Sequence, residues 1–346
     1  MEARGLKAGR IALAALGVML LAGTAAASDN KIVVASGGPH PYFAPWAQAA
    51  ADAQKDFGIA SVEFKVPSDW KLELQTELME SLASQGVNGF GIFPGDPVGV
   101  NSTITELKQN GVPVVMLGGC AQDPTDAVFC FATDPYKTTY TMTKALIDAI
   151  GGKGNIVHIT GQIIDTNTKL REDAVQKAVD ETNGAVKLLQ TVADTDLDPT
   201  VADQKISALF AASKDQIDGI VATAHNSAAV TAKELRSLGD KRIKVIGFDD
   251  DQAVLDDIKD GFAFGTYLQN SYGQAYLGAY VLDLLASKTC TIKDDAPWDK
   301  SPQTAHFIDS GVLKVTADNL ATAADEMKKM ATDIQSKFKA TYLNCK

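Results

Sequence analysis

The chain repeats a unit of strand, loop and helix, and its first copy lies at residues 31–57: KIVVASGGPHPYFAPWAQAAADAQKDF. Its apolar start, residues 31–36, predicts a buried β-strand, a loop with two glycines follows, and residues 45–57 predict a helix. The same order continues along the chain, with further strands predicted at 61–66, 89–93, 114–117, 127–133, 155–160, 187–192, 219–222, 244–247 and 263–268. Because strands that alternate with helices form parallel sheets covered by helices on both faces, the sequence predicts an α/β protein.

The chain is too long for one such sheet. It has 346 residues, whereas a single hydrophobic core stops growing at about 250–300 residues. The chain has two similar halves, each with a series of strand–helix units that leads to an apolar strand. This strand is PVVML at 113–117 in the first half and KVIGF at 244–248 in the second. We therefore predict two doubly wound parallel-sheet lobes, with a ligand cleft between them at the C-terminal ends of the strands.

Residues 1–27 have the layout of a secretory signal peptide. Arg4, Lys7 and Arg10 precede an apolar run at 11–22, and the small residues 25–27 form a cleavage site. The apolar run has about a dozen residues, whereas a spanning helix needs about 20, which disfavours the alternative of a retained membrane anchor. The sequence therefore predicts export to the periplasm.

Charge and motifs argue against several classes of function. The net charge is −11, and it becomes −13 without residues 1–27, which carry three basic residues and one acidic residue. An acidic chain without a Lys/Arg cluster argues against nucleic acid or anionic lipid as a partner. The sequence contains no G-x-x-x-x-G-K-[ST], no H-E-x-x-H and no G-x-S-x-G, so its motifs indicate neither an enzyme nor a cofactor.

The chain has four cysteines, Cys120, Cys130, Cys290 and Cys345, and an even number in an exported protein predicts two disulfides. Four cysteines allow three pairings. We favour Cys120–Cys130, which flank a short turn between two predicted strands, and Cys290–Cys345, which would tie the chain end to the body. A zinc site is the disfavoured alternative, since no C-x-x-C is present and the four histidines are scattered.

The end of the chain follows a different pattern. Apolar residues recur at spacings of three and four, which predicts a long helix with one apolar stripe: Leu320, Ala324, Met327, Ala331, Ile334 and Phe338. We expect this helix to pack across the outside of a lobe. A helix that binds a partner is the alternative.

Five segments form a further pattern when they are taken in order. They are VASGGPHPYF at 34–43, the turn FPGD at 93–96, a helix led by Arg171, VIGFD at 245–249, and a late strand that ends at Gln269. This series resembles the type I periplasmic solute-binding proteins of ABC importers, a family that includes ribose-binding and other sugar-binding proteins.

The resemblance covers nearly all of residues 30–310 and implies the type I periplasmic binding protein fold, in which a three-segment hinge joins two lobes. We place the hinge segments near Asp134, Gln269 and residues 307–308. The expected division is a first lobe of residues 28–134 and 270–307, a second lobe of residues 135–269 and 308–315, and a helical extension of residues 316–346.

The expected ligand-binding residues have a chemistry that suits a sugar. Aromatic rings pack on the C–H faces of a sugar, and charged or amide side chains hold its hydroxyls. We expect Ser36, His40, Tyr42 and Phe43 from the first lobe, with Trp70 from a loop at the cleft edge; Asp165, Asn167, Arg171, His225, Asn226 and Asp249 from the second lobe; and Gln269 near a crossover.

These residues also have structural alternatives. Tyr42 and Phe43 can belong to the core at the start of a helix. Arg171 can be a solvated residue that pairs with a carboxylate of its own helix, and Asp249 can cap the next helix.

The chain departs from the family pattern at two places. His40 stands where the family usually has an asparagine, and Gly118-Gly119 stand where ribose-type sites have an Asp-Arg pair. Two glycines leave room for a different or larger ligand, so the resemblance does not imply ribose.

The resemblance implies a monomer that takes up a monosaccharide, a polyol or an inositol and delivers it to ABC permease and ATPase subunits. An accessory sensor that presents the ligand to a membrane receptor, and an enzyme on the same scaffold, remain alternatives. A transcription regulator with this fold is disfavoured, because such proteins carry a basic helix-turn-helix ahead of the lobes, where this chain has the predicted signal peptide.

Overall fold

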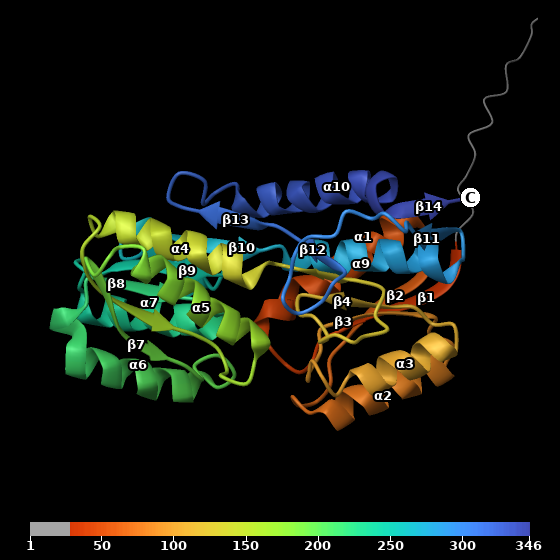
Figure 1. The fold of residues 1–346 in the computed structure, drawn as a ribbon, viewed down its shortest axis with the longest axis horizontal. Helices are drawn as coiled ribbons and strands as arrows, with labels where there is room; N and C mark the ends of the chain where they lie inside the picture. Colours follow the sequence, from red (N-terminus) through yellow and green to blue (C-terminus); the bar gives the residue numbers. More distant parts are fainter. Residues whose placement is uncertain (1–27) are drawn as a thin grey trace, which may run out of the picture.

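The computed structural model describes residues 28–346, which form two lobes side by side (Figure 1). The expected signal peptide, residues 1–27, lies outside the described residues. Each lobe is built on one six-stranded sheet, and a small two-stranded sheet joins β11 (Cys290–Ile292) to β14 (Leu343–Cys345). None of the helices within residues 28–346 combines the length and the apolar character that crossing a membrane requires.

The first lobe is a parallel sheet with the strand order β12-β5-β4-β3-β1-β2. Its strands are β1 (Ser28–Ala35), β2 (Ile59–Lys65), β3 (Gly89–Ile92), β4 (Val114–Leu117), β5 (Cys130–Ala132) and β12 (Phe307–Asp309). One face packs against α1 (Ala44–Phe57) and α9 (Ser271–Ala286), and the other against α2 (Leu72–Ser84) and α3 (Asn101–Gln109). A short 3-10 helix, η1 (Pro41–Phe43), precedes α1.

Strand β1 shows why these strands are apolar throughout. Ile32 and Val34 belong to the core on the α1 and α9 side, whereas Val33 and Ala35 belong to the core on the α2 and α3 side. Because both faces of a covered parallel sheet are buried, successive side chains of one strand are all apolar.

The second lobe repeats this order as β13-β10-β9-β8-β6-β7. Its strands are β6 (Gly154–Ile159), β7 (Val186–Val192), β8 (Gly219–Ala222), β9 (Lys244–Phe248), β10 (Gly265–Gln269) and β13 (Val312–Val315). Helices α4 (Pro135–Ala149) and α5 (Thr166–Asp180) cover one face; α6 (Pro199–Ser213), α7 (His225–Leu238) and α8 (Gln252–Asp260) cover the other, with η2 (Lys214–Gln216) after α6. The prediction of two doubly wound lobes is confirmed, although the edge strand β13 runs antiparallel.

The chain crosses between the sheets three times. Two crossings, from β5 to α4 and from β10 to α9, lie next to Asp134 and Gln269. The third lies at residues 310–311, slightly later than the expected change at 307–308, because Ile308 still pairs with Phe131 in the first sheet.

The crossing segments are hydrogen-bonded to one another. The Asn270 side chain donates to the Ser310 carbonyl oxygen at 2.9 Å, and the hydroxyls of Thr133 and Ser310 lie 3.4 Å apart. Gln274, at the start of α9, donates to the Ser310 hydroxyl at 3.1 Å. Residues from all three crossings therefore meet around Ser310.

The end of the chain forms α10 (Ala323–Tyr342), which runs along both lobes (Figure 1). Its first half packs Met327 against Leu268 of the second lobe, and its second half packs Phe338 against Phe129 of the first. The expected long helix is confirmed, although it begins after Leu320 and leaves Ala324 exposed. The expectation that it packs on one lobe is wrong, because its apolar stripe is long enough to reach across the hinge.

Both expected disulfides are confirmed. Cys120 is bonded to Cys130, and Cys290 to Cys345. The second disulfide attaches β14, and with it the end of α10, to the first lobe through β11.

Candidate ligand-binding site

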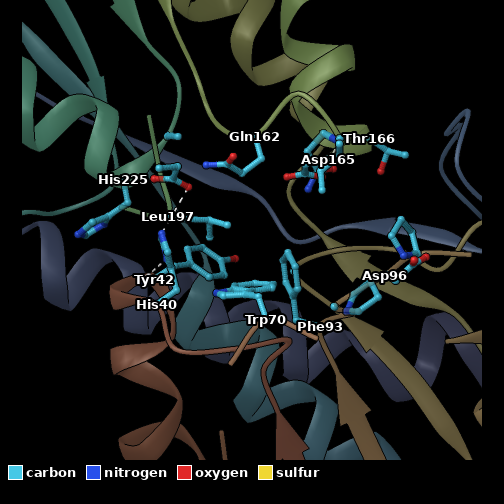
Figure 2. A pocket seen from close by; sticks show the side chains of 18 of the residues that line it. His40, Tyr42, Trp70, Phe93, Asp96, Gln162, Asp165, Thr166, Leu197 and His225 are labelled. Atoms are coloured by element: carbon cyan, nitrogen blue, oxygen red, sulfur yellow. Dashed lines mark hydrogen bonds and ion pairs between the residues drawn. The ribbon is translucent and has the colours of Figure 1, made fainter. Parts of the chain in front are cut away.

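A cavity of about 480 Å³ lies between the two lobes, at the C-terminal ends of the parallel strands. In both sheets the strand order reverses at the first strand of the lobe, β1 or β6, and ligands of open α/β sheets bind beside such switch points. Figure 2 shows the two walls: Trp70 and Phe93 come from the first lobe, and Gln162, Asp165 and Thr166 face them from the second.

Most of the expected ligand-binding residues line this cavity. They are His40, Tyr42, Phe43, Trp70, Asp165, Asn167, Arg171, His225, Asp249 and Gln269. The structure thus brings together residues that lie far apart in the sequence, such as His40 and Gln269.

Ser36 and Asn226 are exceptions, because neither lines the cavity. Ser36 is completely buried at the end of β1, where its carbonyl oxygen accepts a hydrogen bond from Gln75 at 3.1 Å. Asn226 is the second residue of α7, and its backbone N–H donates to the Asp196 carboxylate at 2.9 Å while its side chain donates to the Asp196 carbonyl oxygen. Asn226 therefore positions another cavity residue.

The wall from the first lobe is aromatic. The ring of Trp70 lies 5.9 Å from that of Phe93 and 6.2 Å from that of Phe43, measured between centroids. Tyr42 lies beside them, and its hydroxyl donates to Gln274 at 2.6 Å. These rings provide the apolar surface on which the C–H groups of a sugar pack.

Two glycines hold Trp70 in place. A Cβ atom on Gly38 would lie 2.5 Å from the Trp70 ring, and one on Gly37 would also lie 2.5 Å from it. The indole N–H donates to the Pro39 carbonyl oxygen at 3.1 Å, which holds the ring against this loop. The loop after β1 therefore needs glycine for the close approach of the ring.

Gly118 and Gly119 lie against the aromatic wall, and the expectation that they leave room for a different or larger ligand stays a prediction. A Cβ atom on Gly119 would lie 3.0 Å from the Phe93 ring, and one on Gly118 would lie 3.1 Å from both Phe93 and the Tyr42 hydroxyl. The aromatic rings occupy the space that longer side chains at these positions would need, and Gly118 also has a φ of +75°.

Arg171 is the main positive group of the second-lobe wall. It is only 7% exposed, and its guanidinium carbon lies 5.2 Å from the centroid of the Phe248 ring. It forms no ion pair with any carboxylate of residues 28–346, and its Nε has no partner there. The alternative of a solvated helix residue is excluded, and the N–H donors remain for an acceptor in the cavity.

Asp249 and His225 lie together at the floor of the cavity. The two side chains approach to 3.9 Å, and Gln269 donates to the Asp249 carboxylate at 3.2 Å. Burial raises the pKa of Asp249 to about 6, against the opposing attraction of His225 and Arg171. The cap of α8 is Asp251, whose carboxylate accepts from Ala253, so Asp249 is not the helix cap.

Asp196 is a cavity residue that the sequence analysis did not identify. Its carboxylate lies 3.4 Å from His40 Nε2, and this pair links the second lobe to the first. Burial lowers the pKa of His40 and raises that of Asp196, but their mutual attraction prevails, so the pKa of His40 lies above its usual value and that of Asp196 below. Tyr42 N–H donates to His40 Nδ1, which leaves Nε2 to carry the proton toward Asp196.

Further cavity residues outside the expected set include Phe93, Asp96, Gln122, Gln162, Ile164, Thr166 and Leu197. All of them follow a strand at its C-terminal end. The rule that ligands bind at these ends could have identified their loops, but it does not say which side chain of a loop points inward.

Comparison with known families identifies a match that covers most of the chain. The model of the periplasmic binding protein domain matches residues 32–289.

Relatives with named ligands align over most of the chain. A xylitol-binding protein of Mycolicibacterium smegmatis is 24% identical over 244 residues, 70% of this chain and 69% of the relative. A D-apiose import binding protein of Paraburkholderia graminis is 21% identical over 259 residues, 75% of this chain and 81% of the relative. A solute-binding protein of Burkholderia graminis, solved with D-arabinose, superimposes with a TM-score of 0.74 at 23% identity over 86% of this chain and 98% of its own.

Proposed function

Because this chain belongs to the family of periplasmic binding protein domains, we propose that it captures a monosaccharide or a polyol between its lobes for an ABC importer. The observation that carries the proposal is the unlike chemistry of the two cavity walls. One wall is a set of aromatic rings around Trp70, and the other presents Arg171 and Asp249. A sugar or polyol needs both, since it has apolar C–H groups and a rim of hydroxyls.

The proposed mechanism is hinge closure. Each lobe provides only part of the site, so a ligand that contacts both lobes favours the arrangement that completes these contacts. The pair His40 and Asp196 contributes a direct contact between the lobes beside the ligand. The three crossing segments that meet around Ser310 are the axis about which the lobes turn.

The relatives support the ligand class. Two relatives are described as a xylitol-binding protein and a D-apiose import binding protein, and a neighbour with the same fold was solved with D-arabinose; all three compounds are five-carbon polyols or sugars. The proposed location is the periplasm, and the proposed partners are the permease and ATPase subunits of the importer. The first ligands to try are therefore xylitol, D-apiose and D-arabinose, together with D-xylose, after which a further relative, the D-xylose-binding periplasmic protein of Escherichia coli, is named.

A thermal-shift screen of residues 28–346 tests the proposal, with monosaccharides, polyols, inositols and amino acids as probes. A ligand at about 100 times its Kd stabilises the folded protein by about 2.7 kcal/mol. At about 2–4 °C per kcal/mol, the expected rise of the melting temperature is about 5–10 °C. A shift with an amino acid and none with any carbohydrate would contradict the proposed ligand class.

A further inference from the structure

The two lobes also touch at the mouth of the cavity, through a side chain that does not line it. Gln303 lies in the segment between β11 and β12, and its amide donates to the Thr166 hydroxyl at 2.7 Å and to Asn167 Oδ1 at 3.3 Å. Gln303 is 8% exposed and Asn167 is 9% exposed, so solvent competes little for these hydrogen bonds.

The acceptors of Gln303 belong to the ligand site. Thr166 and Asn167 are the first residues of α5, both line the cavity, and the same helix carries Arg171. A contact that fixes the start of α5 therefore fixes the side chain of Asn167 and the helix that presents the buried guanidinium.

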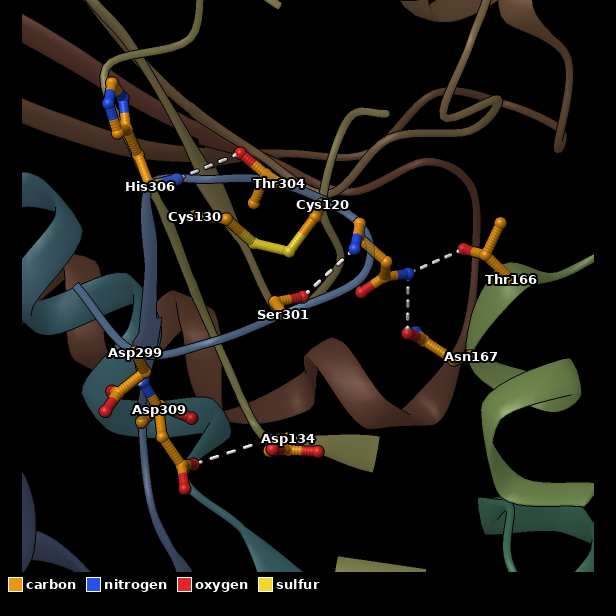
Figure 3. Close-up of a disulfide and its surroundings, with 12 residues drawn as sticks. Cys120, Cys130, Asp134, Thr166, Asn167, Asp299, Ser301, Thr304, His306 and Asp309 are labelled. Carbon is orange, nitrogen blue, oxygen red and sulfur yellow. Dashed lines mark hydrogen bonds between the residues drawn. A yellow bond between two sulfur atoms is a disulfide. The ribbon is translucent and has the colours of Figure 1, made fainter. Parts of the chain in front are cut away.

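The segment that carries Gln303 is held firmly to the first lobe. Asp123 N–H donates to the Gln303 carbonyl oxygen at 3.2 Å, and the Asp123 carboxylate accepts from Ala305 N–H at 2.8 Å and from the Thr304 hydroxyl at 3.2 Å. Asp123 lies in the loop that the Cys120–Cys130 disulfide closes. Figure 3 shows Thr304 and Ser301 beside this disulfide, with Thr166 and Asn167 facing them from the second lobe.

We propose that Gln303 is a positioning residue for ligand binding: from the first lobe it holds Thr166 and Asn167 of the second, and so stabilises the closed arrangement and slows ligand release. The inference rests on the proposed function, because it assigns Gln303 a role in the closure of that same site. It does not make Gln303 a ligand contact.

The test compares Gln303→Met, which keeps the length of the side chain but removes its hydrogen bonds, with Gln303→Glu. A carboxylate can accept from the Thr166 hydroxyl and from a turned Asn167 amide, so Gln303→Glu restores part of the contact. Gln176→Met is the matched control, since Gln176 is exposed on α5 and donates to Asp180 of its own helix. Stopped-flow Trp fluorescence measures association and dissociation of xylitol, D-xylose, D-apiose and D-arabinose.

The loss of one or two hydrogen bonds predicts that Gln303→Met releases the probe about three- to tenfold faster, with an unchanged association rate. Gln303→Glu should recover part of the loss, and Gln176→Met should match the wild type. A wild-type dissociation rate in Gln303→Met would overturn the inference and leave the proposed function intact.

If none of the probes binds the wild-type protein, that result counts against the proposed function. A second readout then tests the role of Gln303 without a ligand. Spin labels on the exposed residues Gln176 and Lys108, one in each lobe, report the distance between the lobes without a ligand. In the free protein the closed arrangement is expected as a minor population, so Gln303→Met should reduce the share of short distances that reports it. An unchanged distance distribution would overturn the role of Gln303 independently of any ligand.

Discussion

Asp249 combines an unusual backbone with an unfavourable charge. Its φ is +61°, in the left-handed region that Asp and Asn tolerate better than other residues with a side chain. It is 6% exposed, and burial raises its pKa to about 6. A buried carboxylate beside Arg171 and His225 is suited to accept hydrogen bonds from ligand hydroxyls, at the expense of stability.

We expect Asp249→Asn to stabilise the unliganded protein at pH 8. The pKa of about 6 in the folded protein lies above the value of about 3.9 in an unfolded chain. The protonated Asp249 therefore stabilises the folded protein relative to the ionised one; this contribution is complete below pH 4 and is lost as the pH rises through 6. A neutral Asn avoids the loss, so it should raise the free energy of unfolding by on the order of 1–3 kcal/mol at pH 8. Urea unfolding at pH 4 and pH 8 measures this, and a variant less stable than the wild type at pH 8 would refute the expectation.

The same substitution should weaken ligand binding, and the affinity of the wild type should fall as the pH drops below 6. A protonated Asp249 accepts fewer hydrogen bonds from hydroxyls, and an amide does not replace a charged acceptor. Calorimetric titrations between pH 5 and pH 8 check this. A wild-type affinity that is flat over this range would mean that Asp249 does not hold the ligand.

Gly38→Ala should displace the Trp70 ring, because the new Cβ would lie 2.5 Å from it. Loss of one aromatic contact of about 1 kcal/mol predicts an affinity about five- to tenfold lower, with a changed Trp emission spectrum. Gly111→Ala is the control: its φ of +77° costs stability, but no atom lies within 4 Å of the added carbon. Equal affinities of Gly38→Ala and the wild type would show that the ring is not part of the site.

The loop after β7 shows why Asp196 could not be predicted. Three aspartates, Asp194, Asp196 and Asp198, lie at every second position, and the sequence alone does not rank them. In the structure Asp194 pairs with Lys205 and Asp198 caps α6, whereas Asp196 reaches His40 in the other lobe. Arg171 and Asp249 could be predicted to lie at the cavity, because the helix led by Arg171 and the segment VIGFD at 245–249 resemble the family pattern.

Helix α10 is the element that differs most from its expected place. Its apolar stripe shows that one face must be buried, but not which surface covers it. The structure shows that β10 and β13 cover its first half and that the first-lobe core covers Phe338, with β14 disulfide-bonded beyond it. The helix therefore links the lobes on the hinge side.

Phe338→Ala should lower the free energy of unfolding by about 3–4 kcal/mol, as for other buried aromatic residues truncated to alanine. Phe338 is 1% exposed, and its ring lies 5.6 Å from that of Phe129 and 4.8 Å from that of Tyr342. Lys337→Ala, an exposed neighbour on the same helix, should change stability by less than about 0.5 kcal/mol. Similar stabilities of both variants in urea unfolding would mean that α10 is not packed on the first lobe.

The alternation of strands and helices could be predicted, because fully apolar strands and amphipathic helices have different periods. The short strands β11, β13 and β14 could not, because they are partly exposed and lack the fully buried apolar run that identifies the equally short β3, β4 and β8. Their pairing depends on contacts formed after the lobes fold. The antiparallel direction of β13 likewise follows from the third crossing, where only two residues separate it from β12.

In the whole molecule, the contacts between the lobes lie on both sides of the ligand cavity. Gln303 and the pair of His40 with Asp196 join the lobes at the cavity, while Ser310 and its partners join them at the crossings. With this arrangement, we expect a ligand held by both walls to change the angle between the lobes. Neither lobe alone should bind the ligand strongly.

Small-angle X-ray scattering of residues 28–346, with and without a ligand whose binding calorimetry has proven, measures this closure. We expect the liganded protein to scatter as this structure does and the free protein to have a larger radius of gyration. Identical profiles at saturating ligand would contradict capture by closure of the two lobes.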